Sequence, residues 1–242
     1  MKKLSKLQKQ KGFTLVELAI VLVIIGLLIG GILKGQQLID NARVTAQMTQ
    51  FQGLQAAETS FQDAYAGLPG DLPSPNTRVP STPPGCNAVG DGNGVIGTPA
   101  TAANIYTIGG VGNENICFFA ELSGAGYLAG VSKPNASPVI FGQTVPQAKL
   151  GAGLIVSDVQ DAPSWSGLYA ADVETTGDPG AVAGVNSMTP GQAGQIDRKM
   201  DDGNPTTGSI LGLGFGTNCT NGGTGYIESS TTNDCDVGFK LN

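Results

Sequence analysis

The most constraining feature of the sequence is a run of about twenty apolar residues near its start. The run extends from Gly12 to Leu33 and contains one charged residue, Glu17. At about 1.5 Å of rise per residue, a helix from Phe13 to Leu33 is roughly 31 Å long, which matches a bilayer hydrocarbon core about 30 Å thick. The run therefore predicts a helix that spans a membrane.

Positive charge is concentrated on the N-terminal side of this run. Lysines stand at positions 2, 3, 6, 9 and 11, whereas only Lys34 and Arg43 closely follow the run. Flanks rich in lysine and arginine remain in the cytoplasm. We therefore expect a cytoplasmic N-terminus and a chain that otherwise lies outside.

The segment around Gly12 is more informative than the far end of the run. A secretory signal would place small residues of the A-x-A type after the apolar run, and residues 30–35 offer no such site. Instead, a short basic leader precedes the motif Gly-Phe-Thr-Leu-Val-Glu. This arrangement resembles the N-terminus of the type IV pilin family. The positions that match the family motif are Gly12, Phe13, Thr14, Leu15 and Glu17.

The resemblance implies how the chain is processed and assembled. A prepilin peptidase would cut after Gly12, and Phe13 would carry an N-methylated α-amino group. The mature chain would sit in the bacterial inner membrane and polymerise with other pilin subunits, in contact with membrane lipid and an inner-membrane assembly platform. The product would be an extracellular type IV pilus or a periplasmic pseudopilus of the type II secretion kind.

Glu17 needs an explanation, because an ionised carboxylate in an apolar helix costs about 2.5–3.5 kcal/mol on insertion scales. The resemblance implies that Glu17 pairs with the new α-amino group of Phe13, on its own or a neighbouring subunit, and so guides assembly. The alternative is that Glu17 reaches the headgroup region and favours the positive end of the helix dipole.

Glycines within and just after the run are spaced for close helix packing. They form two overlapping small-xxx-small pairs, a pattern that lets helices approach within an apolar bundle. Glycine is also simply common in membrane helices, which is the alternative explanation. The residues are Gly26, Gly30, Gly31 and Gly35.

Composition restricts the function further. The formal charge is −6, and removal of the five leader lysines with residues 1–12 changes it to −11, which argues against direct binding of nucleic acid. The chain has no histidine, so Ser-His-Asp and Cys-His catalysis are excluded, and it has no P-loop. We expect a protein that is not an enzyme; a carboxylate-pair hydrolase is the catalytic alternative.

Four cysteines lie on the side of the apolar run that is expected outside the cytoplasm. An even number of cysteines in an oxidising compartment predicts two disulfides, and three pairings are possible. We favour the local pairing of Cys86 with Cys117 and Cys219 with Cys235. A metal-binding quartet is the alternative, although the cysteines lack C-x-x-C spacing. The pilin resemblance also implies a C-terminal loop that is pinned by a disulfide and exposed on the filament.

The rest of the chain predicts a head domain on a helical stem. Residues 1–12 form the leader, 13–33 the membrane and assembly helix, 34–66 the amphipathic half of the same helix, and 67–242 the head. An apolar stripe in the amphipathic half is expected to pack on the head, and Gly67 to Gly70 is expected to end the helix. The stripe comprises Val44, Met48, Phe51, Leu54, Phe61 and Tyr65.

Within the head, the fold class expected is α+β, with the long helix packed on a small antiparallel sheet. One short helix is expected over Asn115–Leu122. A second runs to Met200 from Pro190, with Thr189 as N-cap and Gln192 closing a capping box. Strands are expected at Val139–Phe141, Leu154–Val156, Gly167–Ala170 and Ile210–Phe215.

We expect no cofactor, although two acidic segments contain oxygen ligands suited to calcium. The first holds Asp91 and Asn93 at alternate positions, but it lacks the later Glu of a calcium loop. We favour a glycine-rich turn there. The second holds Asp197, Asp201 and Asp202 near a helix end, where we favour a solvated turn with Asx-type hydrogen bonds.

The leading functional hypothesis is thus a structural subunit of a pilus or pseudopilus. The alternative is a single-pass membrane protein that does not polymerise and presents its head as an adhesin or sensor. The native N-terminus distinguishes the two hypotheses, because only a processed pilin begins at Phe13.

Overall fold

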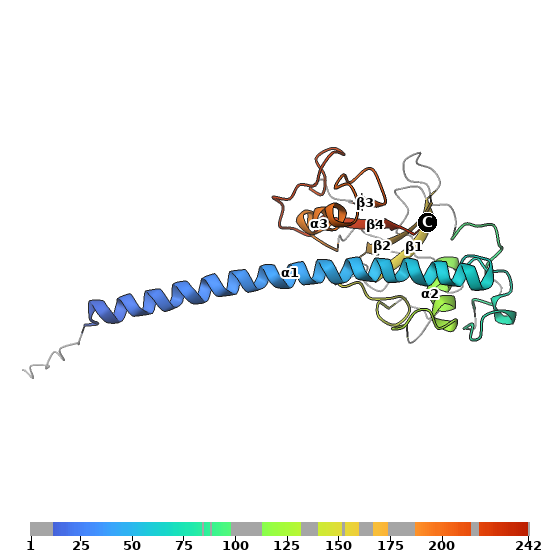
Figure 1. Ribbon diagram of the computed structural model, residues 1–242, viewed down its shortest axis with the longest axis horizontal. Helices are drawn as coiled ribbons and strands as arrows, with labels where there is room; N and C mark the ends of the chain where they lie inside the picture. The colour runs from blue at the N-terminus through green and yellow to red at the C-terminus, as the bar shows by residue number, and fades with distance from the viewer. Residues whose placement is uncertain are drawn as a thin grey trace, which may run out of the picture. The chain divides into compact units, whose positions relative to one another are not determined.

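The structure is a computed structural model. It describes residues 12–83, 85–87, 89–97, 113–131, 140–151, 153–159, 167–173, 187–213 and 218–241. The chain divides into two compact units, Met1–Ala42 and Arg43–Asn242. Helix α1, Leu15–Tyr65, contributes to both units (Figure 1).

The second unit contains the remaining elements. In chain order they are η1 (Pro75–Thr77), α2 (Glu114–Gly124), β1 (Gly153–Val159), β2 (Gly167–Val173), α3 (Pro190–Met200), β3 (Ile210–Leu213) and β4 (Asp236–Lys240). The long helix and small sheet confirm the expected α+β fold.

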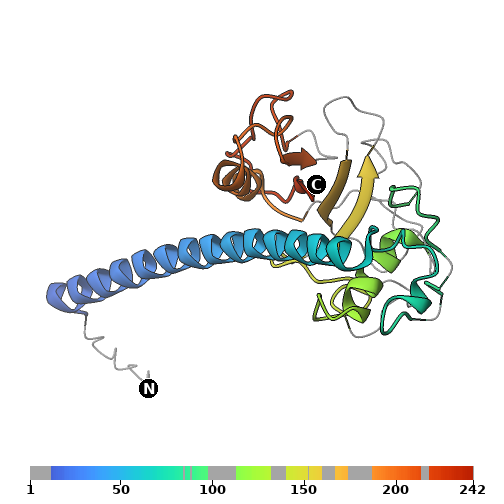
Figure 2. The same ribbon diagram turned by 45° about the vertical axis from the view of Figure 1, so that its right-hand side comes forward.

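The four strands form one antiparallel sheet in the order β1-β2-β4-β3 (Figure 2). The C-terminal strand β4 therefore lies inside the sheet, where the register places Phe239 opposite Ala170 on one side and Ile210 on the other. Because β4 pairs along both of its edges, it connects β3 to the rest of the sheet.

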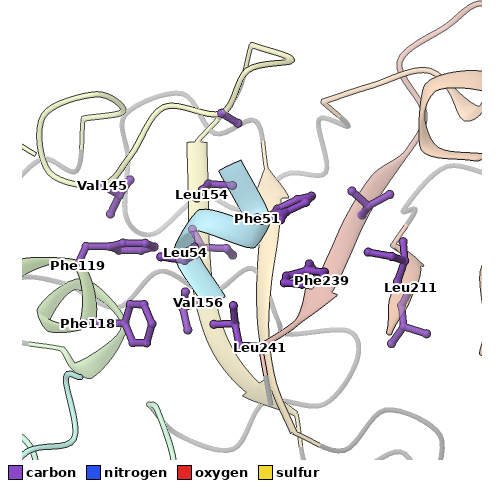
Figure 3. Packing of buried hydrophobic residues seen from close by; sticks show 14 of the residues in the cluster. Phe51, Leu54, Phe118, Phe119, Val145, Leu154, Val156, Leu211, Phe239 and Leu241 are labelled. Carbon is purple, nitrogen blue, oxygen red and sulfur yellow. The ribbon is translucent and has the colours of Figure 1, made fainter. Parts of the chain in front are cut away.

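The outer half of α1 supplies one wall of the core. Its fully buried side chains include Phe51 and Phe61, and the ring of Phe51 stacks on Phe239 of β4 with centroids 5.4 Å apart. Figure 3 shows Phe51 and Leu54 of α1 facing the strand side chains. The expected stripe is confirmed: Val44, Phe51, Leu54 and Phe61 are buried, while Met48 and Tyr65 pack against the core partly buried.

The two short helices flank the sheet. Helix α2 is fixed to β1 by a hydrogen bond that Asn115 Nδ2 donates to the Val156 carbonyl, 2.7 Å long. Helix α3 lies beside β3 and begins with the expected capping box between Thr189 and Gln192. Both helices were expected, although α2 extends from Glu114 to Gly124.

One strand expectation needs correction, and one strand was not expected. The segment expected to form a strand at Val139–Phe141 forms only a single bridge from Phe141 to Val145, and Val139 lies outside the described residues. The Phe141 ring instead lies against Gly153, where an added Cβ would be 1.9 Å from a ring atom, so β1 begins at a position that has no room for a side chain. Strand β3 ends at Leu213, with residues 214–217 outside the described part. Strand β4 was not expected.

Helix α1 ends slightly before the expected glycines. Its last residue is Tyr65, and the residue that follows in the left-handed conformation is Ala66, with φ of 52°. The guanidinium of Arg78 donates a hydrogen bond to the Tyr65 carbonyl. A cation therefore satisfies one of the carbonyl groups that the C-terminal end of a helix leaves without an intrahelical partner.

Candidate functional site

The N-terminal end of α1 is built as a capping box. Thr14 directly precedes the helix, and its hydroxyl accepts a hydrogen bond from the Glu17 amide at 3.2 Å. Glu17 Oε2 in turn accepts from the Thr14 amide at 2.9 Å and from the Thr14 hydroxyl at 2.8 Å. The two residues thus satisfy two N–H groups that a helix start leaves unpaired.

This arrangement changes the interpretation of Glu17. The carboxylate is held at the positive end of its own helix by Thr14, which agrees with the dipole alternative and adds a specific partner. Its proposed pairing with a Phe13 amine concerns the cleaved chain and stays a prediction. The Thr-x-x-Glu spacing is a sequence signal for the capping box that the sequence analysis did not use.

The apolar segment of α1 has no packing partner within the described chain. No described residue before Val44 is buried, and Leu27, for example, is 73% exposed. Of the described helices, α1 is long and apolar enough to cross a membrane, with a mean hydropathy of 2.8 in its most apolar window. An added Cβ would meet no atom within 4 Å at any of the packing glycines, Gly26, Gly30, Gly31 and Gly35.

The head carries two disulfides in the local pairing expected from the sequence. Cys86 is joined to Cys117 of α2, and Cys219 is joined to Cys235 beside β4. The first fixes the segment after η1 onto α2. The second closes the C-terminal loop next to the start of β4, one of the inner strands of the sheet.

The Asp91 segment folds as a turn around a carboxylate that the sequence analysis did not single out. Asp91 accepts from the Asn93 amide, and Asn93 accepts from the Val95 amide, as in Asx turns. These turns direct the Gly92 and Gly94 amides at the two oxygens of Asp71, at 2.7 and 2.8 Å. The side-chain oxygen of Asn93 is therefore used within the turn.

Two carboxylates of α2 lie close to this turn. Glu114 accepts from the Gly97 amide at 2.6 Å, and Glu121 accepts from the Gly70 amide at 2.8 Å. Burial raises the pKa of Glu121 to about 8 against the lowering effect of the Gly70 hydrogen bond, and the charges of Asp71 and Glu114 add to the rise. Burial likewise raises the pKa of Glu114. No local motif joins these two glutamates to Asp71, since Asp71 and α2 come from segments far apart in the sequence.

The second acidic segment is more ordered than a solvated turn. Asp197 is fully buried and accepts from the Tyr226 hydroxyl at 2.8 Å and the Gly203 amide at 2.9 Å. Burial raises the pKa of both Asp197 and Tyr226. The expectation of a solvated turn is therefore wrong for Asp197.

The two later aspartates of that segment satisfy backbone groups. Asp201 accepts from the Ile210 amide at 2.8 Å, which fixes the start of β3. Asp202 accepts from the Asn204 amide at 2.8 Å and from the Thr207 hydroxyl, in the expected Asx manner. Together the three carboxylates hold the turn between α3 and β3.

Comparison with known proteins identifies the N-terminal segment. Residues 7–33 match the prokaryotic N-terminal methylation motif. No curated protein and no solved structure matches the chain.

The match and the geometry define a class of protein. The chain carries the signature of type IV pilins and pseudopilins, followed by an exposed apolar helix and an α+β head with two disulfides. This combination fits a secreted, pilin-like subunit that is anchored in a membrane by α1.

Proposed function

We propose that the protein is a structural subunit of a type IV pilus or of a type II secretion-like pseudopilus. A prepilin peptidase cuts after Gly12, Phe13 is N-methylated, and the mature chain polymerises with other pilin subunits through α1. The observation that carries the proposal is the methylation motif at residues 7–33, which leads directly into an apolar helix with no packing partner in the described chain.

The proposal includes a topology and a set of partners. The leader lysines keep the N-terminus in the cytoplasm, and the helix resides in the inner membrane until the assembly platform extracts it into the filament. Lipid contacts the exposed side chains of α1 before assembly, and neighbouring α1 helices contact them afterwards. The role is structural and not enzymatic, which is supported by the absence of histidine from the sequence.

Mass spectrometry of the native N-terminus tests this function. We expect a chain that begins at N-methylated Phe13 and lacks the first twelve residues. A Gly12→Leu variant should stay at precursor length in the membrane, whereas Gly53→Leu, at an exposed helix position with open space around it, should be processed normally. A native chain that retains its leader would instead support the membrane-anchored adhesin or sensor.

A further inference from the structure

Three carboxylates from separate segments of the head converge on one point. Asp71 follows α1, Asp91 stands in the glycine-rich turn, and Glu114 begins α2. One oxygen of each lies within 4.8 Å of the others. Oxygens that bind Ca²⁺ at about 2.4 Å lie on a sphere about 4.8 Å across, so the three fit a single coordination shell.

The backbone holds these oxygens in place and leaves them able to bind a cation. The Gly92 and Gly94 amides donate to Asp71, and the Gly97 amide donates to Glu114. A carboxylate oxygen has two acceptor positions, and one amide occupies one of them. Asp71 is 3% exposed and Glu114 is 9% exposed, so water hydrates their charges poorly.

A fourth carboxylate, that of Glu121, lies close to these three and has an oxygen without a hydrogen-bond partner in the described chain. Glu121 is fully buried, and its Oε1 has no hydrogen-bond partner among the residues described. Its Oε2 is fixed by the amide of Gly70, the residue directly before Asp71. A buried polar atom without a partner is costly, and a cation at this place would offset that cost.

Gly70 explains how Asp71 comes so close to α2. The residue has φ of 84°, and an added Cβ would lie 2.4 Å from the Glu114 carbonyl and 2.8 Å from the Phe118 amide. The chain therefore passes directly over the first turns of α2. This contact brings the Asp71 carboxylate to the helix that carries both glutamates.

Among the described residues, no ion pair compensates the carboxylates at this place. Within the described part of the chain, the one ion pair found joins Arg198 of α3 to Glu228 of the C-terminal loop. No described lysine or arginine pairs with the four carboxylates. A cavity of about 630 Å³, lined in part by Asp71, Arg78, Gly92 and Gly94, gives solvent access to Asp71.

We propose that Asp71, Asp91 and Glu114 bind a calcium ion, with Glu121 as the adjacent buried carboxylate that the ion compensates. Water that enters through the cavity completes the shell of six to eight oxygens that Ca²⁺ takes; Mg²⁺ demands a stricter octahedron. The Asp197 cluster is not proposed as a site, because each oxygen of its buried carboxylate accepts a hydrogen bond and no oxygen there lacks a partner as Glu121 Oε1 does. The proposal does not depend on polymerisation.

Calcium titration of the full-length protein in detergent tests the site by calorimetry and thermal unfolding. We expect one saturable site with Kd of about 10⁻⁴–10⁻³ M, as in extracellular calcium modules, and a Tm that rises with calcium concentration. Asp91→Asn should weaken calcium binding at least tenfold. This variant keeps the side-chain oxygen that accepts from the Asn93 amide, and Asp91 is exposed, so the fold should survive.

Two further variants complete the test. Asp202→Asn, in the other acidic cluster, should bind calcium as the wild type does. Glu121→Gln should reduce the rise in Tm that calcium gives, because it removes the adjacent carboxylate that the ion compensates. Absence of saturable binding, equal binding by Asp91→Asn, or loss of binding in Asp202→Asn would each overturn the assignment.

Discussion

At the start of α1, Glu17 has two separable properties, a charge and a side-chain acceptor. The acceptor completes the capping box with Thr14, and this box survives cleavage after Gly12 because it uses the amide between Phe13 and Thr14. The charge is what a Phe13 amine on a neighbouring subunit would recognise. Variants can remove one property and keep the other.

Thr14→Ala and Glu17→Gln provide this separation. Glutamine at the third helical position also completes a capping box, so Glu17→Gln loses only the charge, whereas Thr14→Ala keeps the charge and weakens the helix start by about 1 kcal/mol. We expect filament yield to fall sharply in Glu17→Gln and little in Thr14→Ala, with normal processing in both. The reverse order of yields would assign Glu17 to capping alone.

A second residue-scale prediction concerns Glu58, which is 1% exposed on the core face of α1. Burial raises its pKa from 4.5 to about 7, against hydrogen bonds from Thr59 and Gln62. The folded state therefore binds this proton more tightly than the unfolded state does. The associated stability is complete below about pH 4.5 and is lost as the pH rises through 7.

Glu58→Gln should remove this pH dependence. At pH 8 the variant should be more stable than the wild type by on the order of 2 kcal/mol, and near pH 4.5 the difference should disappear. Thermal unfolding at both pH values measures it. Asp63→Asn, an exposed carboxylate on the same helix, should show no such difference. An equal gain for Glu58→Gln at both pH values would rule out the titration of Glu58 as its cause.

At the scale of elements, the sequence predicted an element correctly where the residues that specify it stand close together in the chain. Helix α3 was predicted with its capping box because Thr189, Pro190 and Gln192 stand in adjacent positions. Strand β4 was not predicted. Its apolar residues Val237 and Phe239 stand at alternate positions, as in a strand, but Gly238 lies between them in a short segment that directly follows a loop. Its place inside the sheet depends on pairing with β2 and β3, which no local pattern specifies.

The disulfide beside β4 supports a stability prediction for the C-terminal loop. Cys219 and Cys235 are 16 residues apart, and closing a loop of this length contributes about 3 kcal/mol in the chain-entropy model. We expect the double variant Cys219→Ser/Cys235→Ser to be cut by thermolysin near Ile227 before α1 is attacked. Trypsin is unsuitable, because the sequence between the two cysteines contains no lysine or arginine.

The matched control removes the other disulfide, between Cys86 and Cys117. That double variant should leave the Ile227 region as resistant as in the wild type, because this bridge fixes the segment before α2. Peptide mapping of the first cleavage products distinguishes the variants. First cleavage within α1 in the Cys219 variant would contradict a local role for its bridge.

At the scale of the whole molecule, the sequence predicted the anchored stem but not the candidate cation site. The apolar run and the motif around Gly12 are contiguous in the sequence, so they can be recognised without knowledge of the fold. Asp71, Glu114 and Glu121 become neighbours only when the chain crosses α2 at Gly70. Of the proposed ligands, Asp91 was singled out from sequence, since its Asp-Gly-Asn-Gly turn is a local signal.

The division at Ala42 and Arg43 makes a prediction for the whole chain. Every buried residue of α1 lies at or after Val44, so removal of the first unit takes away no core side chain among the described residues. A fragment of residues 43–242 should therefore fold as a soluble monomer. In the same detergent buffer its Tm should lie within a few degrees of that of the full chain.

A shorter fragment, residues 54–242, is the matched control, because it loses core contacts of the stem. It lacks Phe51, which stacks on Phe239, and Gln47, which accepts a hydrogen bond from the Lys149 amide at 2.7 Å. Loss of a buried phenylalanine alone costs about 3–5 kcal/mol, a large part of the roughly 5–15 kcal/mol that stabilises a domain. Circular dichroism melts of both fragments should thus show a cooperative transition for 43–242 and a much lower or absent one for 54–242. Failure of 43–242 to fold would mean that the apolar half of α1 stabilises the head, which the exposure of its side chains contradicts.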